Sequence, residues 1–227
     1  MEITKSSYVV TIDGPAGAGK STIARRAAKE LGFIYVDTGA LYRAIGLAAQ
    51  RRGYKADDKS AIIPMLGEIK VELAFNEAHE QVVLLSGEDV SGLIRTPEIS
   101  MMASAVSAIP EVRAYLLDLQ RDMAHHNNVI MDGRYIGTVV LPDAQIKIFL
   151  SASPECRAKR RYDELIEKGM DVRYEDILND VVARDYADSH REIAPLKPAD
   201  DAIMVDTSGE DLETSVNKLL DVMRSRL

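Results

Sequence analysis

Residues 14–21 carry the pattern with the clearest chemistry in this chain. They read GPAGAGKS, which fits G-x-x-x-x-G-K-[ST], and the apolar run Tyr8–Ile12 precedes them. Glycines at 14, 17 and 19 let successive backbone N–H groups turn toward one bound anion. Lys20 can then reach the β- and γ-phosphates of a nucleotide, and the Ser21 hydroxyl can bind Mg²⁺. The pattern predicts a phosphate-binding loop between a buried strand and a helix, and an ordinary glycine-rich turn is the weaker interpretation.

Charged residues follow other segments that resemble buried strands. Asp132 comes directly after Val129–Met131, where P-loop proteins place an acidic residue that assists Mg²⁺, often through water. A helix cap or turn is the alternative role for Asp132. Arg43 and Arg134 also lie just beyond predicted strands.

Two further groups of arginines have helical spacing. The first group is Arg157, Arg160 and Arg161, and the second is Arg184 with Asp188 and Arg191. Each set lies on one helical face. Solvated salt bridges would explain such faces, with Asp185 among the available partners. In an acidic protein with a phosphate-binding loop, we favour phosphate contact.

The elements that must position these residues form a repeated strand–turn–helix pattern. Short apolar segments with the length of buried strands are 8–12, 33–36, 129–131, 145–150 and 202–205. The intervening segments have helical periodicity, and the first such helix is predicted over 20–31 with Gly32 as its stop. This pattern predicts an α/β fold with a parallel five-stranded sheet flanked by helices.

Residues 57–105 interrupt this pattern. A short helix is predicted over 57–66, strands over 70–75 and 81–85, and a strand or loop over 89–95. Two helices follow, over 98–108 and 111–125, and the second lies beyond the segment. The segment is therefore predicted to be a mixed α/β insertion.

Composition excludes several classes of protein. The 227 residues carry a net charge of −8, which argues against general nucleic-acid binding. Cys156 is the only cysteine, so an internal disulfide is impossible and a reducing cytoplasm fits. No apolar run is long enough for a transmembrane helix, and the first residues lack the apolar core of a signal peptide.

Taken together, the motifs resemble those of the bacterial cytidylate kinases, within the nucleoside-monophosphate kinases. The resemblance rests on TIDGPAGAGKST (11–22), DTGALYR (37–43), GEDVSGLIRT (87–96), the segment 103–113, and further motifs over 131–144, 157–165 and 184–199. It implies phosphoryl transfer from MgATP to CMP or dCMP in a single domain that acts as a monomer. It divides the chain into a core (1–37, 106–154 and 192–227), a monophosphate-binding region (38–105) and a short helical lid with its following helix (155–191).

The resemblance also assigns roles to individual residues. The ATP-binding residues would be Gly14, Pro15, Ala16, Gly17, Ala18, Gly19, Lys20, Ser21 and Thr22. The CMP-binding residues would be Thr38, Tyr42, Arg43, Ser104, Arg113, Arg134, Tyr135, Arg184, Asp188 and Arg191. Lys20, Arg157 and Arg161 would meet the transferring phosphoryl group, and Ser21 and Asp132 would hold Mg²⁺.

Two positions depart from the family pattern. Tyr135 stands where the family commonly has an aspartate that helps read cytosine, and a neutral phenol offers different hydrogen bonds. Ala187 stands where some relatives have an arginine. Discrimination among CMP, dCMP and UMP is therefore open at this point.

Two other functions are compatible with the phosphate-binding loop. One is a P-loop kinase for a different small acceptor, such as UMP or a shikimate-like metabolite. The other is an ATP-dependent switch or binding module that acts through a protein partner. The insertion and the Ser104/Arg113 pair count against the first, and the lid-like arginines count against the second.

Overall fold

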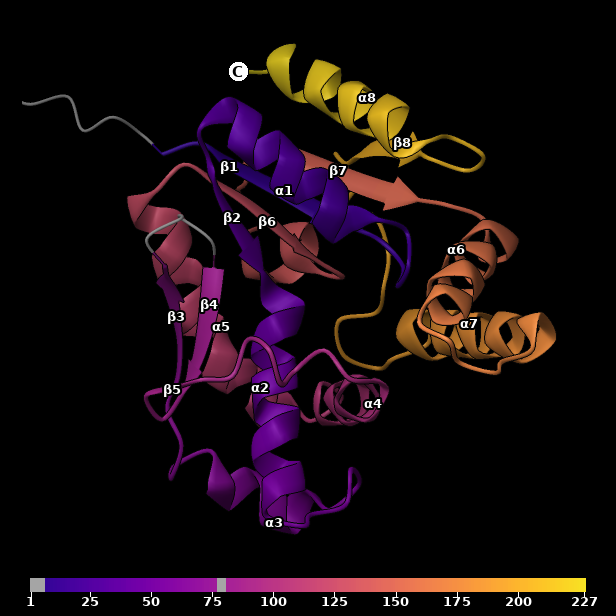
Figure 1. Ribbon diagram of the computed structural model, residues 1–227. Coiled ribbons are helices and arrows are strands. Elements are labelled where there is room, and N and C mark those ends of the chain that lie inside the picture. The colour runs from indigo at the N-terminus through magenta and orange to yellow at the C-terminus, as the bar shows by residue number, and fades with distance from the viewer. Residues whose placement is uncertain (1–6, 77–80) are drawn as a thin grey trace, which may run out of the picture. The chain divides into compact units, whose positions relative to one another are not determined.

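The computed structural model of the chain describes residues 7–76 and 81–227 (Figure 1). Residues 1–6, expected to lack a signal core, and residues 77–80 of the predicted insertion lie outside the described residues. Contacts divide the chain into two units. Unit 1 contains the residues up to Tyr35 together with Asn127–Leu227, and unit 2 is Val36–His126.

Unit 1 is organised around a five-stranded sheet with the order β2-β6-β1-β7-β8. Its strands are β1 (Val9–Asp13), β2 (Ile34–Asp37), β6 (Val129–Gly133), β7 (Ile146–Ser151) and β8 (Ile203–Asp206), and the last two residues of β2 belong by contacts to unit 2. β1 pairs in parallel with both β6 and β7. The predicted parallel sheet flanked by helices is confirmed.

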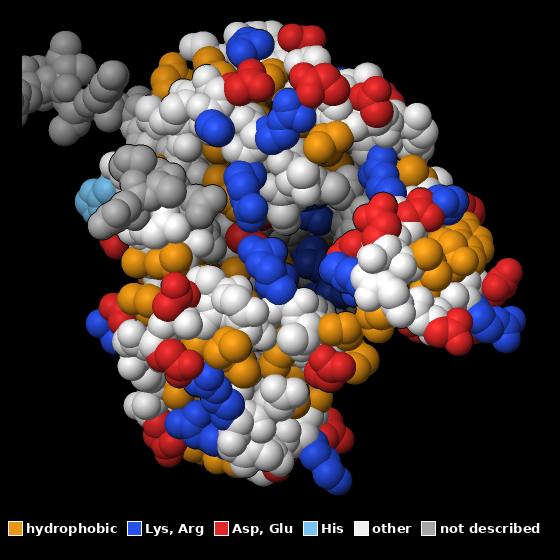
Figure 2. All heavy atoms as spheres, in the orientation of Figure 1, with side chains coloured by type: hydrophobic (Ala, Val, Ile, Leu, Met, Phe, Trp, Pro, Cys, Tyr) orange, Lys and Arg blue, Asp and Glu red, His pale blue; other side chains and the backbone are white. Residues whose placement is uncertain are grey.

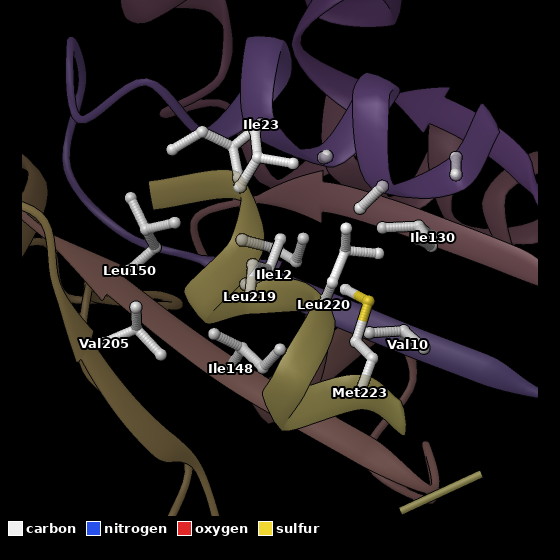
Figure 3. Close-up of a cluster of buried hydrophobic side chains, with 14 of the residues drawn as sticks. Val10, Ile12, Ile23, Ile130, Ile148, Leu150, Val205, Leu219, Leu220 and Met223 are labelled. Atoms are coloured by element: carbon white, nitrogen blue, oxygen red, sulfur yellow. The ribbon is translucent and has the colours of Figure 1, made fainter. Parts of the chain in front are cut away.

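Two helices of unit 1 cover one face of this sheet. α1 (Lys20–Leu31) and α8 (Leu212–Arg224) direct their apolar sides at the strands. Ile12, Ile148 and Leu150 meet Ile23 and Leu219 in the resulting core, where each of these side chains is almost fully buried (Figure 3). α1 begins and ends where its sequence predicted, and Gly32 adopts the left-handed conformation that ends it.

The remaining helices of unit 1 are α6, α7 and a short π-helix. α6 (Pro154–Glu167) and α7 (Tyr174–Ser189) share a small apolar cluster around Ala158, Leu165 and Ile177. Figure 2 shows hydrophobic side chains gathered on the outer side of this helix pair, among acidic and basic ones. The π-helix η1 (Ile136–Val140) was not predicted, because its sequence IGTVV has no helix signal.

Unit 2 combines four helices with a small antiparallel sheet. The helices are α2 (Thr38–Arg51), α3 (Lys59–Met65), α4 (Pro97–Val106) and α5 (Pro110–His126), and the strands are β3 (Val71–Phe75), β4 (Gln81–Leu85) and β5 (Glu88–Asp89). The sheet order is β3-β4-β5. The segment predicted as a strand or loop over 89–95 is mostly turn. Among the described residues, no helix is long and apolar enough to cross a bilayer.

Candidate active site

The phosphate-binding loop connects β1 to α1 in unit 1. Gly14, Gly17 and Gly19 have φ of +151°, +76° and +87°, in the region that favours glycine. A Cβ on Gly14 would lie 2.0 Å from the carbonyl oxygen of Leu150 in β7. Only glycine therefore fits where the chain leaves β1, and the loop can pass close to the neighbouring strand.

Lys20 is the first residue of α1, and its side chain is buried at the loop. Its Nζ donates to the carbonyl oxygen of Pro15 at 2.7 Å. Burial and the charge of Arg134 lower the pKa of Lys20 to about 8, against the opposing charges of Asp132, Asp13 and Asp188. A buried ammonium group in this environment favours an incoming anion, whose charge would support protonation of the lysine.

Ser21 and Asp132 lie together, as their predicted Mg²⁺-binding roles require. The Ser21 hydroxyl donates to Oδ2 of Asp132 at 2.8 Å, and the Tyr35 hydroxyl donates to Oδ1 at 3.0 Å. Oxygen donors of this kind suit Mg²⁺, which uses few protein ligands together with water and phosphate oxygens. No sequence pattern indicated Tyr35, because its contact with Asp132 spans 97 residues.

Asp188 lies among the arginines of unit 1 that are predicted to hold the monophosphate. Nε of Arg134 donates to its Oδ2 at 2.5 Å, and Nη2 of Arg191 donates to its Oδ1. Burial opposes ionisation of Asp188, but the charges of Arg134, Arg191 and Arg184 hold its pKa below the usual value. The four predicted residues Arg134, Arg184, Asp188 and Arg191 thus form one charged cluster.

The two predicted lid arginines have different surroundings. Arg157 is buried, and its guanidinium forms two hydrogen bonds with Asp185 at 2.9 and 2.5 Å. It also donates to the carbonyl oxygens of Ala152 and Ala16, the latter within the phosphate-binding loop. Arg161 is partly exposed and pairs with Glu164 at 2.8 Å. In this structure Arg157 joins the loop, α6 and α7, while Arg161 is on the surface of α6.

In unit 2, the predicted monophosphate-binding residues lie on α2, α4 and α5. Thr38 and Tyr42 are buried on the first turns of α2, and Nη2 of Arg43 donates to Oδ2 of Asp37 at 2.8 Å. Nη2 of Arg95 lies 3.6 Å from the same carboxylate oxygen, a contact that the sequence did not indicate.

The predicted base-reading residues of unit 2 are joined through Ser107. Nε of Arg113 donates to the carbonyl oxygen of Ser107 at 2.5 Å. The Ser107 hydroxyl in turn donates to the carbonyl oxygen of Ser104 at 2.8 Å. The end of α4 and the start of α5 therefore hold Ser104 and Arg113 in one local arrangement.

Arg160, from the first arginine group, and Asp13, for which the sequence assigned no site role, make contacts near the loop in unit 1 that were not predicted. Arg160 donates to the carbonyl oxygens of Thr207 and Glu210, beyond β8. Asp13, which precedes Gly14, accepts hydrogen bonds from the backbone of η1. Both contacts join segments far apart in the sequence, so no local pattern could have revealed them.

The parallel sheet, the loop with Lys20 and the neighbouring arginine cluster define a P-loop kinase. A crystal structure of an uncharacterized protein from Eubacterium ventriosum has a similar fold, with a TM-score of 0.53 and 12% identity over 97% of this chain and 100% of that one. The protein-family model for cytidylate kinase matches residues 10–225. This chain belongs to the cytidylate kinase family.

Curated relatives agree with that membership over nearly the whole chain. The cytidylate kinase of Carboxydothermus hydrogenoformans is 48% identical over 214 residues, covering 94% of this chain and 96% of the relative. That of Syntrophotalea carbinolica is 46% identical, covering 96% of this chain and 92% of the relative. The family resemblance drawn from the sequence motifs is confirmed.

Proposed function

We propose that this chain transfers the γ-phosphoryl group of ATP to CMP or dCMP, giving ADP and CDP or dCDP. The observation that carries the proposal is the arrangement around Lys20 in unit 1. Ser21, next to Lys20 in the predicted donor loop, donates to Asp132 at 2.8 Å, and Arg134, two residues after Asp132, pairs with Asp188 of the predicted acceptor cluster. Membership of the cytidylate kinase family supports CMP and dCMP as acceptors over other small molecules.

The chemistry requires positioning and charge neutralisation. A phosphate oxygen of CMP is already an anion, so it can attack the γ-phosphorus in line without a general base. Backbone N–H groups of the loop and Lys20 would hold the donor phosphates and stabilise the charge that spreads over the transferring group. Mg²⁺, when bound by Ser21 and through water by Asp132, would neutralise phosphate charge.

Each unit carries its own proposed acceptor-binding residues. In unit 1 these are Arg134, Tyr135, Arg184, Asp188 and Arg191. In unit 2, Thr38, Tyr42 and Arg43 would face the monophosphate, and Ser104 and Arg113 would hydrogen-bond cytosine. Arg157 and Arg161 would approach the transferring phosphoryl group, which for Arg157 requires exchange of its present partner Asp185. Residues 38–105 would form the monophosphate region and 155–191 the lid, in a cytoplasmic monomer.

An acceptor panel tests the function. ADP production from MgATP is followed with CMP, dCMP, UMP or AMP as the acceptor, and without any acceptor. We expect CMP and dCMP to give rates far above the others. A preference for UMP would favour the alternative kinase, and acceptor-independent hydrolysis would favour a nucleotide-dependent switch.

Arg113→Ala tests the cytosine site separately. We expect this variant to raise the KM for CMP far more than the KM for ATP, because the loop that binds ATP lies in the other unit. Arg121→Ala, on the same helix and outside the proposed site, is the control. An unchanged KM for CMP in Arg113→Ala would remove this residue from the base site.

A further inference from the structure

Asp13 is a buried carboxylate that the proposed mechanism does not use. It is the last residue of β1 and directly precedes the phosphate-binding loop. Oδ1 accepts a hydrogen bond from the backbone N–H of Ile136, and Oδ2 accepts one from Gly137, each at 2.8 Å. Both oxygens are therefore committed to the first turn of η1.

This arrangement satisfies groups that η1 cannot satisfy itself. The first N–H groups of any helix have no partner within it. Asp13 supplies acceptors for two of them from 123 and 124 residues earlier in the chain. Burial raises the pKa of Asp13, against the two backbone hydrogen bonds and the charges of Lys20 and Arg134. The two backbone hydrogen bonds therefore favour the charged form of Asp13 at a place where burial disfavours it.

Close packing fixes the same segment from a second side. A Cβ on Gly137 would lie 2.8 Å from the Thr11 hydroxyl oxygen and 3.3 Å from carbons of the Lys147 side chain. Thr11 is fully buried on β1, so it has little room to move. η1 can approach β1 this closely only because residue 137 has no side chain.

The segment held in this way carries two predicted acceptor residues. Arg134 and Tyr135 directly precede Ile136, and Nε of Arg134 donates to Asp188. We propose that Asp13 is a positioning residue, which fixes Arg134 and Tyr135 relative to the phosphate-binding loop by anchoring the N–H groups of Ile136 and Gly137. One side chain at the start of the donor loop thereby sets the place of the acceptor groups. This inference rests on the proposed function.

Asp13→Asn tests the proposal with little change in shape. The amide can accept only one of the two hydrogen bonds, and its NH₂ group faces the other backbone donor. We expect the KM for CMP to rise about tenfold or more, because the loss of one charge-assisted hydrogen bond corresponds to a factor of about that size. The KM for ATP should change less than about twofold. Asp211→Asn is the matched control, because that carboxylate caps α8 of the same unit and asparagine caps equally well.

Gly137→Ala tests the same segment without altering Asp13. The new methyl group must displace η1 from Thr11, so the KM for CMP should rise in this variant also. Thr11→Ala in the double variant removes the hydroxyl that the methyl group meets, and we expect it to return the KM for CMP toward the wild-type value. A role in stability alone would shift the urea midpoint of these variants and leave both KM values unchanged.

The outcomes separate this inference from the proposed function. A wild-type protein that makes no ADP with CMP would overturn the function itself. With an active wild type, an unchanged KM for CMP in folded Asp13→Asn would overturn only the positioning role. If Asp13→Asn does not fold, Gly137→Ala decides: a raised KM that Thr11→Ala reverses supports the role, and an unchanged KM overturns it.

Discussion

At the scale of single residues, Lys20 shows how a site for phosphate differs from a site built for stability. Its ammonium group is buried, and burial together with Arg134 lowers its pKa to about 8. Between that pKa and 10.5, the unfolded chain therefore binds more protons than the folded chain. The contribution of Lys20 to the free energy of unfolding becomes less favourable as pH falls through that range. A buried lysine of this kind suits phosphate binding, because the negative charge of a bound phosphate would stabilise its ammonium group.

Lys20→Ala should therefore separate chemistry from acceptor binding. We expect kcat to fall by about 10²–10³, because a donor aimed at the developing charge is removed. CMP affinity, measured by calorimetry, should remain nearly intact. Lys29→Ala, in the last turn of the same helix, is the control and should keep full activity. Full turnover by Lys20→Ala would remove this lysine from the transfer step.

Asp188 differs from Lys20, since its charge is stabilised by the arginines around it. Burial opposes that charge, but Arg134, Arg191 and Arg184 lower the pKa of the carboxyl below 3.8. A depressed carboxyl pKa contributes stability that is fully present above the unfolded pKa and is lost as pH falls through the folded one. We expect Asp188→Asn to lower the free energy of unfolding by about 3 kcal/mol near pH 7, since two arginines lose their counter-charge.

Urea unfolding at several pH values checks this prediction. The difference between wild type and Asp188→Asn should be constant down to about pH 5 and should shrink as the pH falls below 3.8. Asp180→Asn, exposed on the same helix, should change stability by less than about 0.5 kcal/mol at every pH. A difference that does not vary with pH would show that the charge of Asp188 is not what stabilises the cluster.

At the scale of elements, a helix or strand could be predicted where its own residues determine it, and could not where distant residues do. α1 was predicted over its full length, because Gly19 and Gly32 mark its two ends locally. η1 was missed, since Val139 and Val140 favour strands and the acceptors for its first N–H groups come from Asp13. Likewise, helical spacing placed Arg157 on one face with Arg161, and Asp185 was among its possible salt-bridge partners, but only the fold brings Ala16 to it.

The junction of β1 and the loop gives a prediction about elements. Gly14→Ala would place a methyl group 2.0 Å from a backbone oxygen of β7, so β1 and β7 would have to separate. We expect a loss of stability above about 3 kcal/mol, together with loss of ATP binding. Gly32→Ala is the control, because that glycine has φ of +68° with open space around its Cβ position.

Thermal unfolding and ATP titration of the two glycine variants measure the effect. Gly32→Ala carries only the left-handed backbone cost, about 1 kcal/mol, and should bind ATP normally. Equal destabilisation of the two variants would mean that the close approach to Leu150 does not constrain the loop.

At the scale of the whole molecule, each unit has its own buried interior. Unit 1 is assembled from two separate stretches of chain, and its core is built from α1, α8 and residues of β1, β2, β6, β7 and β8. Unit 2 is one continuous stretch, in which Leu41, Ile45 and Ile99 are fully buried or nearly so. Proteins open in cooperative segments that often coincide with such cores. The two units should therefore differ in which substitutions weaken them.

Paired core truncations test that expectation. Leu219→Ala removes a fully buried side chain from unit 1, and Ile45→Ala removes one from unit 2, each at an expected cost of about 3 kcal/mol. Hydrogen exchange should show faster opening of β1, β6 and β7 in the first variant, and of β3 and β4 in the second. If either truncation lowered protection equally in both sheets, the two cores would have to open as a single cooperative unit, and the donor loop and the insertion would not have separate stabilities.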